Sequence, residues 1–305
     1  MEPVLDASGQ PISGIVHTPD AEGVTVKNRL WRGYYVSDFP EAEVRMDRLC
    51  EFSPRPDDVF IYAYLKCGTH WLHEICHFLL TGQAEVRPQP KELAMVEAVD
   101  LEDLDKIPSP RVLNCHMRCS ILPQRLVAGN KIIYVVRNPK DTAVSLYHHV
   151  AGIDDYEYKG SFKGFLGLFE NGTMDAGSWF SHTRDFLTAM AREGGGNILM
   201  VEFERLKRDP ESQIRRIARF LLDIDISDSL LTAICEKVSF KSMQKARSND
   251  FKEFFNERAS QHGFYRKGEV GDWRNYFDEE SSLRIDRLCA EALAGFEHLY
   301  QPIYE

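Results

Sequence analysis

The fold of this chain is constrained most strongly by two short apolar runs. Each run is followed at once by a polar loop and then by a helical pattern. The runs cover residues 59–64 and 131–136, and the loops after them contain Lys66-Cys67-Gly68-Thr69 and Arg137-Asn138-Pro139-Lys140-Asp141. Continuous apolar runs of this length are typical of strands buried on both faces of a parallel sheet. Such sheets bind ligands at the carboxyl ends of their strands, where helix N-termini present free N–H groups. Both loops are therefore predicted to lie at a ligand site.

The alternation of strands and helices continues along the chain. Further strands are predicted at 111–116 and 198–201, and helices at 71–80, 210–222 and 281–296. No repeat or linker divides the 305 residues, so we predict an α/β fold, a single domain with a central parallel β-sheet flanked by helices. A polar arm rich in Gly, Pro and Asp is predicted at 1–25, and the domain itself at 26–305.

Composition limits the function classes. With 43% hydrophobic and 28% charged residues, the chain reads as an ordinary soluble globular protein. Its net charge of -10 disfavours general nucleic-acid binding, which needs surplus Lys and Arg, but permits a local basic pocket. Seven scattered cysteines, no secretory leader and no apolar run of about 20 residues predict reduced thiols, a cytoplasmic location and no membrane contact.

The first loop has the parts needed to hold a phosphate. Gly68 allows the backbone to approach an anion closely, Lys66 adds a positive charge and Thr69 a hydroxyl. It is P-loop-like without being a Walker A loop, because Lys precedes Gly and GxxxxGK[ST] is absent. Taken alone, the segment is equally well explained as a strand-to-helix turn with a solvated lysine.

Three distant segments together resemble the motifs of the cytosolic sulfotransferases. Residues 60–71 are similar to the family's 5′-phosphosulfate loop, and residues 133–145 to its 3′-phosphate motif. Residues 264–273, with Arg266-Lys267-Gly268 and Gly271-Asp272-Trp273, resemble its RKGxxGDW motif. The order and spacing of these motifs fit across nearly the whole chain.

The resemblance implies a donor nucleotide, 3′-phosphoadenosine 5′-phosphosulfate (PAPS), which leaves as 3′-phosphoadenosine 5′-phosphate (PAP), and it implies no metal. An anionic ligand with charge at both ends needs two separated cationic cradles. The 5′ cradle would comprise Lys66, Cys67, Gly68, Thr69, His70 and Trp71. The 3′-phosphate and adenine sites would comprise Arg137, Ser145, Phe203, Val238, Phe240, Arg266, Lys267 and Gly268.

The resemblance also implies how the sulfuryl group is transferred to a hydroxyl or amine of a small acceptor. His116 falls at the family's catalytic histidine and would take the acceptor proton. Lys66 would neutralise the leaving phosphate, and Ser145 would hold the 3′-phosphate and restrain Lys66.

Several positions depart from the family pattern. Asn114 stands where a lysine is usual, and Phe203 and Val238 each lack a hydroxyl that could bond the nucleotide. His70 replaces a threonine, and we hypothesise that it adds charge at the 5′ end. These departures leave open a catalytically weak or inactive PAP-binding protein. The family's dimerisation motif is absent after Trp273, so a monomer or a different dimer is predicted.

The residues that form the acceptor pocket are the hardest part of the site to predict from the sequence. Its nearest matches are Tyr34, Tyr35, Asn114, Tyr147, His148 and His149. A pocket lined by Tyr and His would suit a more polar acceptor than a plain phenol or steroid, although these side chains could equally pack in the core.

A second motif points to different chemistry. His73-Glu74-Ile75-Cys76-His77 matches HExxH, in which two histidines one helical turn apart share a zinc ion. A zinc metallohydrolase is therefore a remote alternative, although no third-ligand motif follows. A P-loop kinase is less well supported, because the chain has neither a Walker A loop nor a clear magnesium carboxylate beside its loop.

Overall fold

Four parallel strands form the central sheet in the computed structural model of the protein, which describes residues 2–87, 89–192, 195–250, 252–260 and 263–305. Their order is β5-β4-β6-β7, with bounds β4 (Val59–Ala63), β5 (Val112–Cys115), β6 (Lys131–Val136) and β7 (Ile198–Glu202). Every residue of β4 is buried, which fits its continuous apolar sequence, and β5 is equally buried although it contains the polar Asn114. The predicted α/β fold with a parallel sheet is confirmed.

The chain moves outward from the two middle strands of this sheet, β4 and β6, toward opposite edges. From β4 it passes through α2 (Thr69–Thr81) to β5 at one edge, whereas from β6 it passes through α4 (Pro139–Val150) and on to β7 at the other edge. Because crossovers between parallel strands are right-handed, α2 and α4 leave toward opposite faces of the sheet. The loops after the paired strands β4 and β6 therefore border one crevice.

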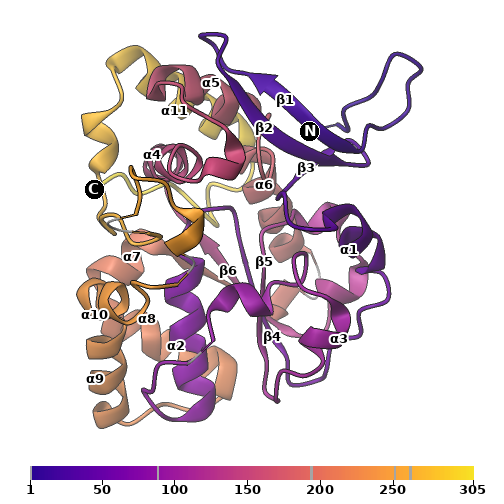
Figure 1. Ribbon diagram of the computed structural model, residues 1–305. Coiled ribbons are helices and arrows are strands. Elements are labelled where there is room, and N and C mark those ends of the chain that lie inside the picture. Colours follow the sequence, from indigo (N-terminus) through magenta and orange to yellow (C-terminus); the bar gives the residue numbers. More distant parts are fainter. Residues whose placement is uncertain (1, 88, 193–194, 251, 261–262) are drawn as a thin grey trace.

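The other helices cover the two faces and the ends of the sheet (Figure 1). They are α1 (Ala42–Arg48), α3 (Leu101–Leu104), α5 (Phe162–Asn171), α6 (Trp179–Ala191), α7 (Phe203–Arg208), α8 (Pro210–Leu222), α9 (Asp228–Lys237), α10 (Phe240–Ala246) and α11 (Glu279–Leu293). α2 packs against α8, and α6 packs against α11. Among the described residues, no helix has the length and apolarity that a membrane crossing requires.

A second, antiparallel sheet lies at the N-terminus and was not anticipated. It has the order β1-β2-β3, with β1 (Gly14–Pro19), β2 (Thr25–Trp31) and β3 (Tyr34–Val36). Residues 14–19 of the predicted polar arm thus pair with the first strand of the predicted domain. Within the arm, Asp20 accepts a hydrogen bond of 2.6 Å from the hydroxyl of Tyr158. Alternating exposure along β1 leaves it without the continuous apolar run that marks a central strand.

Helix boundaries follow glycines in left-handed conformations. α2 begins at Thr69, two residues before the predicted start, because Gly68 forms its N-cap with φ 113°. α11 ends at Leu293 rather than at 296, shortly before Gly295 with φ 86°. β6 and α8 have the predicted bounds, and Pro210 occupies the first turn of α8 as expected for a rigid φ.

Candidate active site

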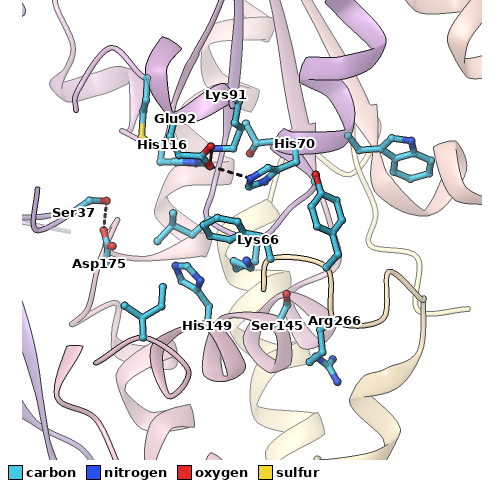
Figure 2. A pocket seen from close by; sticks show the side chains of 18 of the residues that line it. Ser37, Lys66, His70, Lys91, Glu92, His116, Ser145, His149, Asp175 and Arg266 are labelled. Carbon is cyan, nitrogen blue, oxygen red and sulfur yellow. Dashed lines mark hydrogen bonds and ion pairs between the residues drawn. The ribbon is translucent and has the colours of Figure 1, made fainter. Parts of the chain in front are cut away.

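A cavity of about 720 Å³ lies at the carboxyl ends of β4 and β6. The predicted residues that line it are Lys66, Gly68, Thr69, His70, Trp71, His116, Arg137, Ser145, His149, Phe203, Val238, Phe240, Arg266, Lys267 and Gly268. Figure 2 shows Lys66 between His116 on one side and Ser145 and His149, both from α4, on the other. Three motifs far apart in the sequence therefore meet around one space.

The loop after β4 has a backbone conformation that few residue types adopt. Lys66 has φ 67° and Gly68 has φ 113°, both in the left-handed region. A Cβ atom on Gly68 would lie 3.0 Å from the Phe203 ring, so a larger residue would also require this ring to shift. A left-handed lysine is sparsely populated and costs free energy, which is characteristic of loops shaped for a ligand.

The Lys66 ammonium is held in an environment that disfavours its charge. Burial, together with the positive charge of Lys91, lowers the pKa of Lys66 to about 7. Its Nζ lies 5.2 Å from the centroid of the Phe264 ring. An anionic ligand would restore the charge, because an opposite charge nearby favours the ammonium form.

Asp141 joins the second loop to the C-terminal motif. Its carboxylate accepts N–H bonds from Gly271 (2.8 Å) and Trp273 (3.0 Å). The same side chain is held by Asn138, the N-cap of α4, whose Nδ2 donates to Asp141 at 2.9 Å. One buried carboxylate thereby fixes residues 271–273 to the start of α4.

Cations from both segments line the cavity beside this junction. Arg137 places its guanidinium 4.4 Å from the centroid of the Phe203 ring and donates to the Glu269 carbonyl at 2.7 Å. Arg266 and Lys267 both bind Asp272, at 2.5 Å each. Although burial opposes it, these two cations hold the pKa of Asp272 at about 2.

The backbone of Gly268 packs closely against the aromatic ring of Phe240. Gly268 has φ 63°, and a Cβ atom there would lie 2.3 Å from Phe240 Cδ2. On the other side of the cavity, Trp71 meets Phe203 edge to face with ring centroids 5.5 Å apart. The aromatic side chains predicted at the 5′ cradle and the adenine site, Trp71, Phe203 and Phe240, therefore line the cavity.

Three buried polar atoms of the two loops lack a partner within the described residues, as does Glu92 Oε2 in the same lining. The three are Thr69 Oγ1, Trp71 Nε1 and Arg137 Nε. Buried donors are nearly always satisfied in folded proteins, so such atoms in a cavity wall indicate a ligand. Their residues come from both loops, which fits a ligand with anionic groups at two places.

His116 follows β5 and faces the same cavity. Its Nδ1 donates to the carbonyl of Ala63 at 2.8 Å, which leaves Nε2 as the acceptor nitrogen. Its backbone N–H donates to the carboxylate of Glu97 at 2.6 Å. Burial, assisted by the Lys91 charge, lowers the pKa of His116 to about 3, so the imidazole is neutral at physiological pH.

Apolar side chains form another part of the cavity lining, which also contains the charged Lys27, Arg29 and Asp38. Leucine, methionine, valine, isoleucine and phenylalanine side chains form this apolar part, namely Leu65, Leu93, Met95, Val99, Ile153, Phe254 and Phe264. At the far end, Asp175 accepts from Ser37 at 2.8 Å and from the Tyr156 hydroxyl at 2.7 Å. Burial raises the pKa of Asp175. Ser37 and Asp175 are labelled together in Figure 2.

Several predicted site residues lie outside the cavity lining. Tyr147 packs against Phe162 and donates to the Gly160 carbonyl at 3.3 Å, because its position on α4 faces α5 rather than the cavity. Tyr34, Tyr35 and His148 are likewise absent from the described lining, as are Cys67 and Asn114. The Cys67 thiol points inward, 3.7 Å from the Thr142 hydroxyl. His149 is the member of the predicted acceptor set that does line the cavity.

The HExxH residues serve other contacts. His73 Nε2 lies 3.1 Å from the Val112 carbonyl, and burial lowers the pKa of this histidine well below its usual value. Glu74 forms an ion pair with Arg247, whose Nε donates to it at 3.1 Å. In the part of the chain that is described, no three His, Cys, Asp or Glu side chains are grouped as metal ligands. The motif thus forms part of the packing of α2.

A charged pair missed by the sequence analysis lies next to His70. Lys91 and Glu92 belong to η1 (Lys91–Ala94), a short 3-10 helix, and both line the cavity. Glu92 Oε1 lies 2.9 Å from His70 Nε2 and 3.1 Å from Lys91 Nζ. Despite Glu92, burial lowers the pKa of His70 to about 4, so this histidine is neutral at physiological pH in the free protein. That His70 adds charge when a donor is bound stays a prediction. A Lys-Glu pair in a loop carries no sequence signal for such a role.

Comparison with known proteins gives one consistent result. The sulfotransferase domain family matches residues 56–297. Sulfotransferase 1B1 of Canis lupus familiaris is 31% identical over 259 residues, covering 80% of this chain and 86% of that protein. The amine sulfotransferase of Oryctolagus cuniculus is 30% identical over 261 residues, covering 82% and 85%. The mouse sulfotransferase SULT7A1, solved with PAP, matches with a TM-score of 0.73 at 30% identity, over 88% of this chain and 94% of that one.

Proposed function

Because this chain belongs to the sulfotransferase domain family, whose members use PAPS as donor, we propose that its cavity transfers a sulfuryl group to a hydroxyl or amine of a small acceptor. The observation that carries the proposal is the convergence of Lys66, Ser145 and the neutral His116 on one cavity. The unpartnered polar atoms of Thr69, Trp71 and Arg137 in the same region support it.

The donor would be held at both of its charged ends. The helix N-terminus after Gly68, with Thr69, Trp71 and Lys66, would bind the 5′ group. Arg137, Ser145, Arg266 and Lys267 would bind the 3′-phosphate. Trp71 and Phe240 would flank the adenine, with Phe203 and Val238 completing its walls and Gly268 allowing Phe240 to approach closely.

In the proposed reaction, His116 takes the proton from the acceptor group at Nε2 as the acceptor attacks sulfur. A new bond from the acceptor oxygen or nitrogen to sulfur forms, while the bond from sulfur to the bridging phosphate oxygen breaks. Lys66 offsets the negative charge that this oxygen gains. Holding the reactants in line accounts for much of the acceleration, as in phosphoryl transfer.

The proposed acceptor is a small molecule with a largely apolar body. The apolar walls formed by residues such as Leu93, Val99 and Ile153 favour such a body. His116 and His149 would meet the polar end that carries the nucleophile, and Ser37 and Asp175 would meet any polar group at the far end. A monomeric state, or a dimer unlike that of the family, and a cytoplasmic location stay predictions.

The proposal is tested by incubating the full chain with PAPS labelled in its sulfate group and a panel of phenols, aliphatic alcohols, sterols and amines. Transfer of label to at least one class supports the proposal and defines the acceptor. Tight PAP binding with no labelled product from any class would contradict it. That result would favour a nucleotide-binding protein without turnover, the alternative suggested by Asn114, Phe203 and Val238.

A further inference from the structure

Lys91 is a buried cation at the reactive part of the cavity. Its side chain is only 5% exposed, yet it lines the same cavity as Lys66 and His116. Figure 2 shows Lys91 with Glu92 and His116, across from Lys66. A buried ammonium needs compensation from partners or from a bound anion, because removing the charge from water is costly.

Asn114 holds Lys91 in place from β5. The Asn114 Nδ2 donates to the Lys91 carbonyl at 2.8 Å, and its Oδ1 lies 3.5 Å from Lys91 Nζ. The backbone after η1 runs beside the same strand, with the Val96 N–H donating to the Asn114 carbonyl at 3.0 Å. Lys91 is therefore fixed by a strand residue two positions before His116, rather than carried on a free loop.

The partners of Lys91 leave it able to bind an anion. An ammonium has three donors, and among the described residues its contacts are Glu92 Oε1 at 3.1 Å and the longer one to Asn114. Glu92 Oε1 is shared with His70, which burial keeps neutral. Although burial opposes it, Lys91 holds the pKa of Glu92 well below its usual value, so Glu92 is a carboxylate in the same lining. Lys66 and Lys91 are cations of this wall, and the charge of Lys91 adds to the effect of burial in lowering the pKa of Lys66.

We propose that Lys91 contacts the sulfuryl group of the bound donor and stabilises its oxygens during transfer, a role that rests on the proposed function. The uncharged Asn114 then serves as a positioning residue for this lysine. The loop after β4 would hold the 5′ group from the side of Lys66, whereas Lys91 lines the cavity beside His116. A cation delivered from η1 beside His116 would meet these oxygens at the end of the cavity where the acceptor enters.

The test compares PAPS and PAP binding by calorimetry without acceptor, using the parent and Lys91→Met. These nucleotides differ only by the sulfuryl group. We expect Lys91→Met to weaken PAPS binding about tenfold while PAP binding stays within about twofold of the parent, because a lost bond to a charged group has at least this effect. Lys267→Met is the matched control and should weaken both nucleotides equally.

A second experiment moves the positive charge from position 91 to position 114. In Lys91→Met combined with Asn114→Lys, we expect the parent ratio of PAPS to PAP affinity to return. If Lys91→Met loses PAP binding through misfolding, Lys91→Gln is measured instead, since it keeps a donor beside Glu92 and Asn114. An unchanged ratio in the folded variant, or an equal loss of both nucleotides, overturns the proposal. A parent that binds neither nucleotide overturns the proposed function itself.

Discussion

At the residue scale, Lys66 combines a left-handed backbone with a desolvated ammonium, and its proton should be linked to donor binding. Since burial lowers its pKa to about 7, most Lys66 is neutral at pH 8 in the free protein. Binding of PAP restores the charge, so we predict uptake of roughly one proton at pH 8, and affinity that falls as pH rises above about 7. Calorimetry in buffers of different ionisation enthalpy measures this uptake.

The matched variant is Lys66→Arg, because a guanidinium stays charged throughout this range. It should bind PAP without proton uptake and with a flatter pH dependence. Uptake that persists in Lys66→Arg would assign the proton to another group, such as His70 or His116, whose pKa values are lowered by burial. No uptake in the parent would contradict the account of Lys66.

Residues inside a local motif could be assigned from the sequence, whereas those that depend on distant contacts could not. Gly68, Thr69 and Trp71 follow one strand and share one loop, so their placement follows from the chain order. Lys91 reaches the cavity only because η1 runs beside β5. Tyr147 was misassigned because helical phase alone does not say which face of α4 meets the cavity and which meets α5.

At the element scale, the close approach of Gly268 to α10 shapes the predicted adenine site. A methyl group at Gly268 would lie 2.3 Å from the Phe240 ring, and the backbone there has φ 63°. We predict that Gly268→Ala weakens PAP binding at least about tenfold by displacing Phe240, since a lost stacking surface is worth on the order of 1–3 kcal/mol. Nucleotide titration followed by tryptophan fluorescence measures the effect.

Gly82 provides the matched control for this substitution. It closes α2 with φ 68°, and a Cβ atom added there would meet no other atom within 4 Å, so Gly82→Ala carries the backbone strain without the clash. We expect Gly82→Ala to lose about 1 kcal/mol of unfolding free energy and to bind PAP normally. Equal PAP affinities in the two variants would show that Phe240 does not need its present position.

The positions of strands and helices could be predicted where a strand is buried along its whole length or where apolar residues recur with the period of a helix. β6 and α8 have the expected bounds because β6 is apolar and buried after Lys131, and α8 is strongly amphipathic. The N-terminal sheet escaped prediction because β1 alternates between exposed and half-buried residues and its partner lies beyond a turn. Its pairing depends on contacts such as Tyr158 with Asp20, which are 138 positions apart.

At the scale of the whole molecule, Asp141 links segments about 130 positions apart into one nucleotide site. Asp141→Ala would leave the N–H groups of Gly271 and Trp273 and the Asn138 amide without this acceptor. We predict a loss on the order of 3 kcal/mol in unfolding free energy and a clear loss of PAP affinity. Denaturant unfolding and nucleotide titration of the same samples provide both values.

Asp278→Ala separates a general loss of stability from a loss at the site. Asp278 caps α11 by accepting from the Ser281 N–H at 2.8 Å, away from the cavity lining. Its removal should cost about 1 kcal/mol of stability and leave PAP affinity unchanged. An Asp141→Ala protein that binds PAP as tightly as the Asp278→Ala protein would contradict the linking role of Asp141.

The central claim, that His116 is the base for sulfuryl transfer, is tested by single-turnover transfer from labelled PAPS to the best acceptor of the panel. We predict that His116→Ala slows transfer by at least about a hundredfold while PAP affinity stays unchanged, the loss typical of a missing general base. His298→Ala, an exposed histidine, should match the parent. Transfer by His116→Ala at the parent rate would contradict the account.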